Sequence, residues 1–403
     1  MSAHRALPLI LALVAAAPAC FPKGWPPPEA PLYLERTSPF DVGPYLVMLA
    51  PGRMAVVLEH DLPEPPRISW RTATTPLGER TALEIDGLWV ATLEGLPLDE
   101  PLSYQVSSAA GNVGPVAFRA GRSRGQRFSF AAFGDTRTGH DVHRALVAAM
   151  AQEPVELVVH SGDLVETGGV AAQWALFLQI EEPLMAGRPL LAAVGNHDNS
   201  QRLHYRRYFL ADAVAEGNRY FYQDWGDLRV IIMDSEVEAR RGSEQYAFLE
   251  AALRDGAAKD MIMVLSLHYP PYSSGAHGST LELREVLGEL APRYGVELVL
   301  AGHDHNYERT KRIDGVTYMV AASGGAPIRR VRPSWFSAAV RTEPHFVIFD
   351  VDKKSLVGRA VNLDGETFDS FVIPPNPPRP DFELESVVPP APARRVAASG
   401  GVR

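Results

Sequence analysis

Strand-length apolar runs recur between residues 127 and 305, and each ends in a cluster of Gly, Asp, Asn or His residues. Helical segments such as HRALVAAMAQ and LELREVLGELAPRYG separate them, an alternation typical of an α/β fold. In open α/β sheets, ligands bind beyond the carboxyl ends of the strands, so the polar clusters are predicted to converge on one crevice. The runs are FSFAAFGD, ELVVHSGD, LLAAVGNHD, MIMVLSLH and VELVLAGHDH.

Three later runs, VTYMVAAS, HFVIFDVD and LVGRAVNL, are predicted to form a second sheet that closes this α/β domain, which we place at residues 126–373. Upstream, between Tyr45 and Ala120, short strand-like runs alternate with turn signals, the pattern of a β-sandwich of roughly 80 residues. We place this sandwich at residues 41–122 and interpret it as a scaffold, with Trp70 and Trp89 as core residues.

Both ends of the chain differ in composition from these domains. Residues 21–40 are proline-rich and are predicted to be a linker. Residues 374–403 are rich in proline and small residues and are predicted to be a disordered tail.

The N-terminus carries an apolar run from Ala6 to Ala17, preceded by His4 and Arg5. This run is shorter than the roughly 20 residues that span a bilayer, and it fits the core of a secretory signal peptide. We therefore expect export, with residues 1–20 as the signal. The single cysteine, Cys20, stands where a bacterial lipobox places its lipidated cysteine, which predicts a lipoprotein anchored to a membrane in the periplasm or at the cell surface. The alternative is cleavage after Ala19 and ordinary secretion.

The chain has 403 residues and a net charge of -9, which argues against a nucleic-acid partner because neutralising phosphates needs a basic face. A small anionic ester remains open as a substrate, since bound cations can dominate the local field.

Taken singly, the polar residues at the strand ends carry little information, because an Asp there often caps the next helix and a lone His is usually structural. Together they have the composition of a two-metal ligand set, since a carboxylate can bridge two cations while imidazole and amide groups complete the shells. His303 and His305 are two residues apart, so a strand would point both in the same direction, one toward each metal. The set is Asp135 in GDTR, Asp163 in GDLVE, Asn196 and His197 in GNHD, His268 in SLHYPP, and His303 and His305 in GHDH.

From residue 127 to about residue 365 the chain resembles the calcineurin-like metallophosphoesterases, and specifically the purple acid phosphatase branch. GHDHNYER is close to that branch's GHxHxYER, and GSEQYAFLEAAL and HYPPYSSGAH are similar to further segments of it. The upstream region, with GPYL and ISW, resembles the family's N-terminal fibronectin-like domain. The resemblance implies a fibronectin III-like β-sandwich followed by an α/β metallophosphoesterase domain with two β-sheets flanked by helices.

The resemblance also implies a role for each residue of the set. His197 would face the phosphate and the leaving oxygen without binding metal. His277 resembles a further substrate-contacting histidine, for which a loop residue without function is the alternative. The implied metal ligands are Asp135 and His305 on the first ion, Asn196, His268 and His303 on the second, and Asp163 bridging both.

Two positions depart from the family pattern. Many metallophosphoesterases have a ligand His where this chain has Arg137, and purple acid phosphatases have a ligand Tyr where it has Glu166. Arginine has no acceptor atom and cannot bind a metal, whereas a glutamate oxygen can. Alternatively Arg137 and Glu166 pair with each other, Arg137 turns to the substrate phosphate, or the two are unrelated surface residues.

We predict an exported enzyme that hydrolyses small phosphate monoesters, or diesters, by attack of a hydroxide generated on two metal ions. Fe, Zn and Mn all suit His, Asp and Asn ligands, so the metals stay open. The alternative is a catalytically weak, surface-anchored binding protein that keeps the fold. The retained His197 and the complete second-metal set favour the enzyme.

Overall fold

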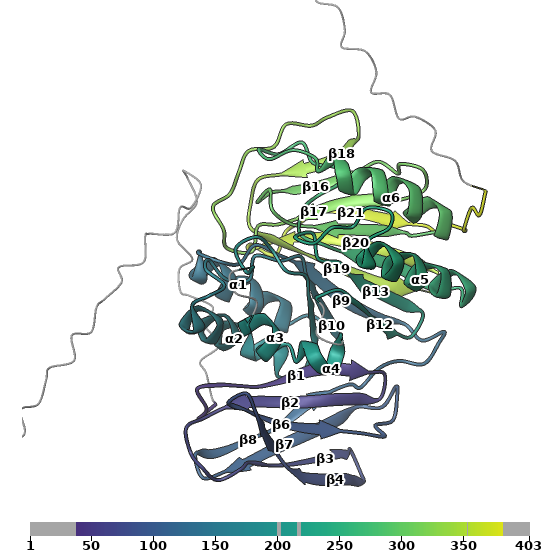
Figure 1. The fold of residues 1–403 in the computed structure, drawn as a ribbon. Helices are drawn as coiled ribbons and strands as arrows, with labels where there is room; N and C mark the ends of the chain where they lie inside the picture. Colours follow the sequence, from purple (N-terminus) through teal and green to yellow (C-terminus); the bar gives the residue numbers. More distant parts are fainter. Residues whose placement is uncertain (1–37, 200–202, 216–218, 353, 382–403) are drawn as a thin grey trace, which may run out of the picture.

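A computed structural model describes residues 38–199, 203–215, 219–352 and 354–381. An N-terminal β-rich part lies against a larger α/β body (Figure 1). Among the described residues, none of the helices combines the length and apolar character needed to cross a membrane. The expected signal peptide and Cys20 lie outside the described residues.

The N-terminal part consists of two four-stranded antiparallel sheets, with strand orders β1-β2-β6-β5 and β4-β3-β7-β8. Alternate residues of β1 and β3 enter one apolar cluster, among them Leu46, Met48, Ile68 and Trp70, so the two sheets pack face to face. The strands are β1 Val42–Ala50, β2 Arg53–Glu59, β3 Arg67–Thr72, β4 Pro76–Thr81, β5 Leu83–Ile85, β6 Leu88–Leu93, β7 Leu102–Ser108 and β8 Gly111–Phe118.

The α/β body contains two further sheets. The six-stranded sheet has the order β11-β10-β9-β19-β20-β21, and its first three strands are parallel to one another. The seven-stranded sheet has the order β12-β13-β14-β15-β17-β16-β18, with β13, β14, β15 and β17 parallel. The strands of the first sheet are β9 Phe128–Phe133, β10 Leu157–His160, β11 Leu190–Ala192, β19 His345–Asp352, β20 Ser355–Asn362 and β21 Thr367–Ile373. Those of the second are β12 Phe221–Trp225, β13 Leu228–Ile232, β14 Ile262–Ser266, β15 Leu298–Ala301, β16 Tyr307–Thr310, β17 Thr317–Ala321 and β18 Ser337–Arg341.

Helices cover the outer faces of both sheets, so the body has four layers (Figure 1). Residues of α1, α2 and α3 share an apolar cluster with the first sheet, those of α5 and α6 share one with the second, and a third cluster fills the space between the sheets. The N-terminal part joins this body through Tyr45, whose hydroxyl donates to the Tyr208 carbonyl at 2.8 Å. The helices are α1 His140–Ala151, α2 Ala171–Met185, α3 Leu203–Tyr208, α4 Ala211–Val214, α5 Glu244–Ala258 and α6 Leu281–Tyr294.

The prediction that the three later runs form a separate second sheet is wrong. VTYMVAAS forms β17 in the seven-stranded sheet, whereas HFVIFDVD and LVGRAVNL form β19 and β20 beside β9 in the other. β19 pairs antiparallel with β9 because it covers the open edge of that strand and stacks Phe349 on Phe130, with ring centroids 4.9 Å apart. The two sheets flanked by helices are present, but the runs divide between them.

The prediction of a disordered tail is wrong for residues 374–381. Asn376 is buried, its side chain donates to the Val296 carbonyl at 2.8 Å, and its backbone N–H donates to the carboxylate of buried Glu297 at 3.2 Å. Arg379 continues the attachment by a backbone bond to Arg293. Bonds from Asn376 and Arg379 therefore fix a segment whose proline-rich composition pointed to disorder. Residues 382–403 lie outside the described residues.

Candidate metal centre

The polar clusters of both sheets meet at one place. Asp135 follows β9, Asp163 follows β10, Asn196 follows β11, His268 follows β14, and the loop between β15 and β16 carries the last two histidines. Backbone bonds connect neighbouring loops within each sheet: Asp135 N donates to Gly162 O at 3.0 Å, and Gly302 N donates to His268 O at 3.0 Å. The polar clusters therefore converge on one place, where they are supplied by two sheets rather than one.

Asp135, Asp163 and His305 form a buried triad with one potential ligand atom from each side chain, all within 4.8 Å of one another. His305 Nε2 lies 3.4 Å from Asp135 Oδ1. This distance is longer than an ordinary hydrogen bond. Two ligand atoms of the same tetrahedral metal ion, each ~2.1 Å from it, are ~3.4 Å apart. The spacing fits ligands arranged around a cation.

A second group of donors adjoins the triad through Asp163. His268 Nε2 lies 3.4 Å from Asp163 Oδ1 and 3.1 Å from Asn196 Oδ1. The ring of His303 lies beside that of His268, with centroids 5.1 Å apart, and its backbone N–H donates to both oxygens of Asp135 at 3.1 Å. All six candidate ligands are thus brought together, with the potential ligand atoms of the triad within 4.8 Å of one another.

The imidazoles of His268 and His305 are held in the form that binds metal. His268 Nδ1 donates to Ser161 O at 2.9 Å, and His305 Nδ1 donates to Pro327 O at 2.8 Å. In each ring this leaves Nε2 with a free lone pair directed at a carboxylate of the triad. Burial is the main reason that the pKa of His305 falls to about 3, so this ring is neutral in the protein.

The centre has more negative charge than its own cation compensates. Asp135 and Asp163 are almost fully buried, and burial followed by the charge of Asp163 raises the pKa of Asp135 well above its usual value. The positively charged side chain beside these two aspartates is Arg137, which also pairs with Glu166. Its Nε lies 3.3 Å from Asp163 Oδ2 but lacks the alignment of a hydrogen bond. A carboxylate excess in a buried site with two free imidazole lone pairs fits bound metal ions.

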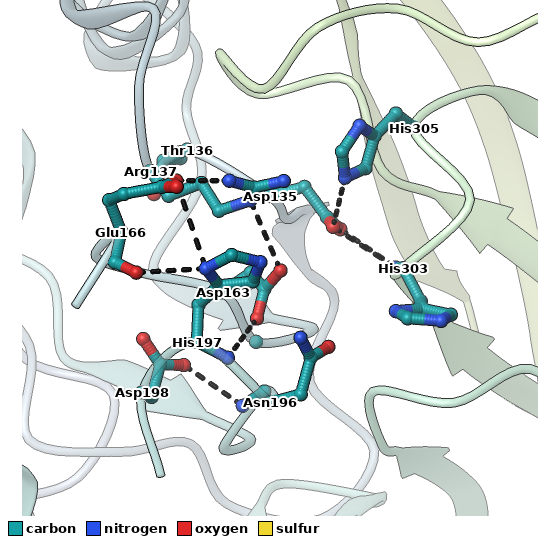
Figure 2. A network of polar contacts seen from close by, with 12 residues as sticks. Asp135, Thr136, Arg137, Asp163, Glu166, Asn196, His197, Asp198, His303 and His305 are labelled. Carbon is teal, nitrogen blue, oxygen red and sulfur yellow. Dashed lines mark hydrogen bonds and ion pairs between the residues drawn. The ribbon is translucent and has the colours of Figure 1, made fainter. Parts of the chain in front are cut away.

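Arg137 and Glu166, the two departures from the family pattern, contact each other (Figure 2). Of the alternatives that the sequence left open, the structure contains the ion pair between Arg137 and Glu166. The two are therefore not unrelated surface residues. Arg137 stands between Glu166 and Asp163, close to the triad. The pair occupies one side of the centre without adding a further metal ligand from Arg137.

His197 lies next to the triad and is partly exposed, at 28% of its side chain. Its backbone N–H donates to Asp163 Oδ1 at 3.0 Å, and its Nδ1 donates to the Glu166 carbonyl at 2.8 Å (Figure 2). The Glu166 carboxylate also lies 3.8 Å from Nδ1. Because Nδ1 is bonded, Nε2 is the nitrogen left to meet a ligand.

The premise that His303 and His305 share a strand is wrong, since β15 ends at Ala301 and β16 begins at Tyr307. Both histidines have positive φ, 74° and 49°, which places them in the left-handed region where a strand cannot continue. The loop, rather than strand alternation, sets the direction of these two side chains.

Two buried carboxylates inside the motifs were not singled out by the sequence. Asp198 accepts from Gly195 N at 2.9 Å and Val165 N at 3.0 Å, so it ties together the loops after β10 and β11. Burial, and then the charge of Asp163, raises the pKa of Asp198 to about 8. Asp304 plays a similar part, accepting from His277 N at 2.7 Å and from the Ser273 hydroxyl. The sequence signal that could have identified these two aspartates is their position inside the motifs GNHD and GHDH.

His277 lies at the edge of the centre, and its ring is tilted against that of His303 with centroids 4.2 Å apart. Its Nε2 contacts the guanidinium of Arg329, a residue that the sequence analysis did not identify. Arg329 Nη1 also donates to His303 O at 3.0 Å. The structure thus adds an arginine to the site, contributed by the segment between β17 and β18.

Comparison with known proteins gives a family match and several distant relatives. Residues 128–307 match the family described as Calcineurin-like phosphoesterase. The chain is 27% identical over 271 residues to "Probable inactive purple acid phosphatase 1" of Arabidopsis thaliana, covering 54% of this chain and 43% of that protein. It is 26% identical over 271 residues to "Nucleotide pyrophosphatase/phosphodiesterase" of Hordeum vulgare, covering 54% of this chain and 72% of that protein.

Among solved structures, a purple acid phosphatase from yellow lupin (Lupinus luteus) seeds superimposes with a TM-score of 0.73. It is 21% identical and the match covers 82% of this chain and 74% of that one, which shows a shared fold. The chain spans less than half the length of the Arabidopsis relative that it matches.

Proposed function

Since this chain carries a calcineurin-like metallophosphoesterase domain with purple acid phosphatases among its relatives, we propose that it hydrolyses small phosphate esters with two bound metal ions. Phosphate monoesters are the first substrate class, and phosphodiesters are the second. The ions are drawn from Fe, Zn and Mn, all of which suit oxygen and imidazole ligands.

One observation carries this proposal: two buried carboxylates lie beside two imidazole nitrogens whose lone pairs are free. His305 Nε2 and His268 Nε2 each lie 3.4 Å from an oxygen of Asp135 or Asp163, and both rings donate their other nitrogen to a backbone carbonyl. Without a cation, such a group costs stability and has no compensating role in the core. With two cations it becomes a phosphate-binding centre.

Bound metal ions would neutralise phosphoryl oxygens and lower the pKa of a water molecule. The remaining tasks belong to the protein. Asp163 is shared between the two ligand groups, so its carboxylate fixes their spacing. His197 Nδ1–H donates to the Glu166 carbonyl, so a protonated His197 would present its Nε2–H as the proton donor to the leaving oxygen.

Because Glu166 is paired with Arg137, we infer that the first metal site has three side-chain ligands, Asp135, Asp163 and His305. We therefore infer that the first ion binds more weakly than the second, which has Asn196, His268 and His303 together with the shared aspartate. Glu166 stands where the purple enzymes have their ligand tyrosine, so an iron-loaded protein should show no tyrosinate charge-transfer band.

The second candidate function is a catalytically weak binding protein. The name of the Arabidopsis relative contains the word "inactive", which describes that relative. The anchored His197 favours catalysis here, because simple phosphate binding has no need for a positioned proton donor.

Export and attachment to a membrane through Cys20 belong to the same proposal and rest on the N-terminal sequence alone.

Hydrolysis of p-nitrophenyl phosphate and bis(p-nitrophenyl) phosphate tests the proposed function. Metal-free protein should be inactive, and adding Mn²⁺, Zn²⁺ or Fe should restore hydrolysis of at least one ester. Asp163→Ala should abolish it, while Asp61→Ala, an exposed carboxylate in the N-terminal part, should not. A metal-loaded wild type that binds phosphate but hydrolyses neither ester would establish the binding protein instead.

A further inference from the structure

His160 is the last residue of β10 and precedes Asp163 by three residues. Its side chain is fully buried, and the rings of Phe133 and Phe177 meet it edge-on, with centroids 4.8 Å and 5.9 Å away. A buried imidazole costs free energy unless its two nitrogens find hydrogen-bond partners. The partners of these nitrogens therefore show what a histidine contributes at a position that an apolar residue could fill.

Three hydrogen bonds fix the tautomer of His160. Gly162 N donates to its Nδ1 at 3.2 Å, so Nδ1 carries the lone pair and the proton is on Nε2. Nε2 lies 3.3 Å from Thr136 Oγ1 and donates to it, because the single hydroxyl proton of Thr136 is donated to Leu164 O at 3.1 Å. Burial keeps the pKa of His160 well below its usual value, so the ring is neutral.

These bonds join the two loops that carry the aspartates of the triad. Thr136 directly follows Asp135, whereas Gly162 and Leu164 stand on either side of Asp163. Backbone bonds run between the same loops, from Asp135 N to Gly162 O at 3.0 Å and from Thr136 N to Asp163 O at 3.1 Å. The imidazole adds a side-chain connection at the point where the two aspartates must lie close together.

The two aspartates need such a connection, because their own chemistry opposes a close approach. Both are buried, both have positive φ, 58° and 56°, and the charge of Asp163 disfavours ionisation of Asp135. A metal ion that binds to both carboxylates gains most when their spacing is already set, since any rearrangement on binding subtracts from the affinity.

We propose that His160 is a positioning residue for the first metal ion, and that it acts through Thr136 and Gly162 on the spacing of the two aspartates. The first ion is the one assigned to Asp135, Asp163 and His305, so the proposal rests on the proposed function and deepens it. The second ion shares only Asp163 with this arrangement. Loss of the connection should therefore weaken the first ion selectively.

Calorimetric titration of the metal-free protein with Zn²⁺ tests this selectivity, because it gives a Kd for each ion without depending on turnover. His160→Phe keeps a buried ring and loses both bonds of the imidazole. Thr136→Val keeps the shape of the side chain and loses the hydroxyl, whereas Thr136→Ser keeps the hydroxyl. Phe177→Leu is the matched control, because it changes the packing around His160 and removes none of these hydrogen bonds.

His160→Phe and Thr136→Val should each raise the Kd of the first ion about tenfold and that of the second ion less than about threefold. The double variant should lose little more than either single variant, because both changes break the same bond. Thr136→Ser should bind both ions as the wild type does. Phe177→Leu should lower the midpoint of urea unfolding and leave both Kd values unchanged.

The tautomer of His160 gives a second readout that does not depend on metal. Nitrogen NMR of the ¹⁵N-labelled, metal-free protein distinguishes a protonated ring nitrogen from an unprotonated one. The histidine signals that disappear in His160→Phe should belong to a neutral ring with its proton on Nε2. A proton on Nδ1 would overturn the connection, because Gly162 N could then not donate to that nitrogen.

An unchanged first-ion Kd in His160→Phe and Thr136→Val, an equal loss at both ions, or the same loss in Phe177→Leu would overturn the positioning role. This outcome is separable from that of the proposed function, because metal binding is measured without an ester. A wild type that binds two ions and hydrolyses no ester loses the proposed function and can still confirm the role of His160. An active esterase whose variants keep the first ion retains the proposed function and loses this inference.

Discussion

Four of the six candidate ligands adopt a backbone conformation that is uncommon for residues with a side chain. Asp135, Asp163, His303 and His305 have φ between 49° and 74°. Each such residue carries strain of order 1 kcal/mol, and Asp and His tolerate it better than most residues. The strained residues and the buried carboxylates lie in the same place, so forming the metal-free centre lowers the free energy of unfolding of the protein.

Asp135→Asn tests that trade-off at a single residue. Asn keeps an acceptor for the His303 N–H but cannot ionise, whereas burial and then the charge of Asp163 disfavour the ionised form of Asp135 and raise its pKa. The metal-free variant should therefore melt a few degrees above the metal-free wild type, since about 1 kcal/mol corresponds to ~2–4 °C in a domain of this size. Calorimetric scans without metal give the comparison. A lower melting temperature for the variant would show that the carboxylate is stabilising.

His197→Ala tests catalysis at a single residue. The imidazole is anchored through Nδ1 but belongs to neither group of candidate ligands, so its loss should leave bound metal unchanged. Turnover should fall by roughly 10²–10⁴-fold, the usual contribution of a proton donor. Metal content and kcat of the purified variant decide the point. An unchanged kcat would remove His197 from the mechanism, and lost metal would make it a structural residue.

At the scale of the elements, α1 and α2 are joined by a buried pair behind the first sheet. His143 Nε2 and Glu181 Oε1 lie 2.6 Å apart, and both side chains are buried. Burial lowers the pKa of His143 to about 3 and raises that of Glu181 to about 8. At neutral pH the pair is therefore held as an uncharged hydrogen bond between the helices.

Glu181→Gln should change the pH dependence of stability. In the unfolded chain the carboxyl ionises above its ordinary pKa of 4.5, whereas in the folded protein it stays protonated up to about 8. Its stabilisation is thus fully present below pH 4.5 and is lost as the pH rises toward 8. Gln cannot ionise, so the variant should gain on the wild type across this window, by up to about 1.4 kcal/mol per pH unit.

Urea unfolding of both proteins at pH 5 and pH 8 measures this difference. Parallel stability curves would mean that Glu181 does not change its protonation state in the folded protein. A variant that is less stable by the same amount at both pH values would mean that an ion pair with His143 holds the helices together.

The elements that the sequence predicted are those with a strong local pattern. β9, β10, β14 and β15 are buried along their whole length or nearly so, and each appeared as a continuous apolar run. β4 and β5 have no such run, because nearly all of their residues are exposed, as expected for strands at sheet edges. The pairing of β19 with β9 was also missed, since the order of strands in a sheet depends on contacts far apart in the chain.

The same distinction applies to the centre. The candidate ligands were found because each directly follows a strand, which is a local signal. Arg329 was not, because only the folding of a distant segment brings it to His277 and His303. The Arg137–Glu166 contact was one of several open alternatives, since sequence gives positions but not side-chain directions.

At the scale of the whole molecule, the N-terminal sheets and the α/β body share continuous apolar clusters. Residues of β1 and β2 lie in the same cluster as residues of α2 and α3, which places the sheet β1-β2-β6-β5 against these helices (Figure 1). The β-rich part therefore supports the body on the side of the first sheet. Its kinship to fibronectin domains stays a prediction of the sequence.

Cys20→Ser tests where the molecule resides. If Cys20 is lipidated, the exported protein should enter the detergent and membrane fractions, because more than one acyl chain gives stable anchoring. The Ser variant should be released or remain unprocessed. Fractionation of cells expressing both proteins, with mass spectrometry of the N-terminus, measures this. A freely soluble wild type with an N-terminus after Ala19 would establish ordinary secretion instead.

Metal titration of the metal-free protein tests the central claim most directly. Calorimetry with Zn²⁺ or Mn²⁺ should show two ions per chain, the weaker one assigned to the site formed by Asp135, Asp163 and His305, and Asp163→Ala should bind neither ion tightly. Loading with iron should give no tyrosinate band. A wild type that binds no metal, an Asp163→Ala variant that keeps both ions, or a purple iron-loaded protein would contradict the account.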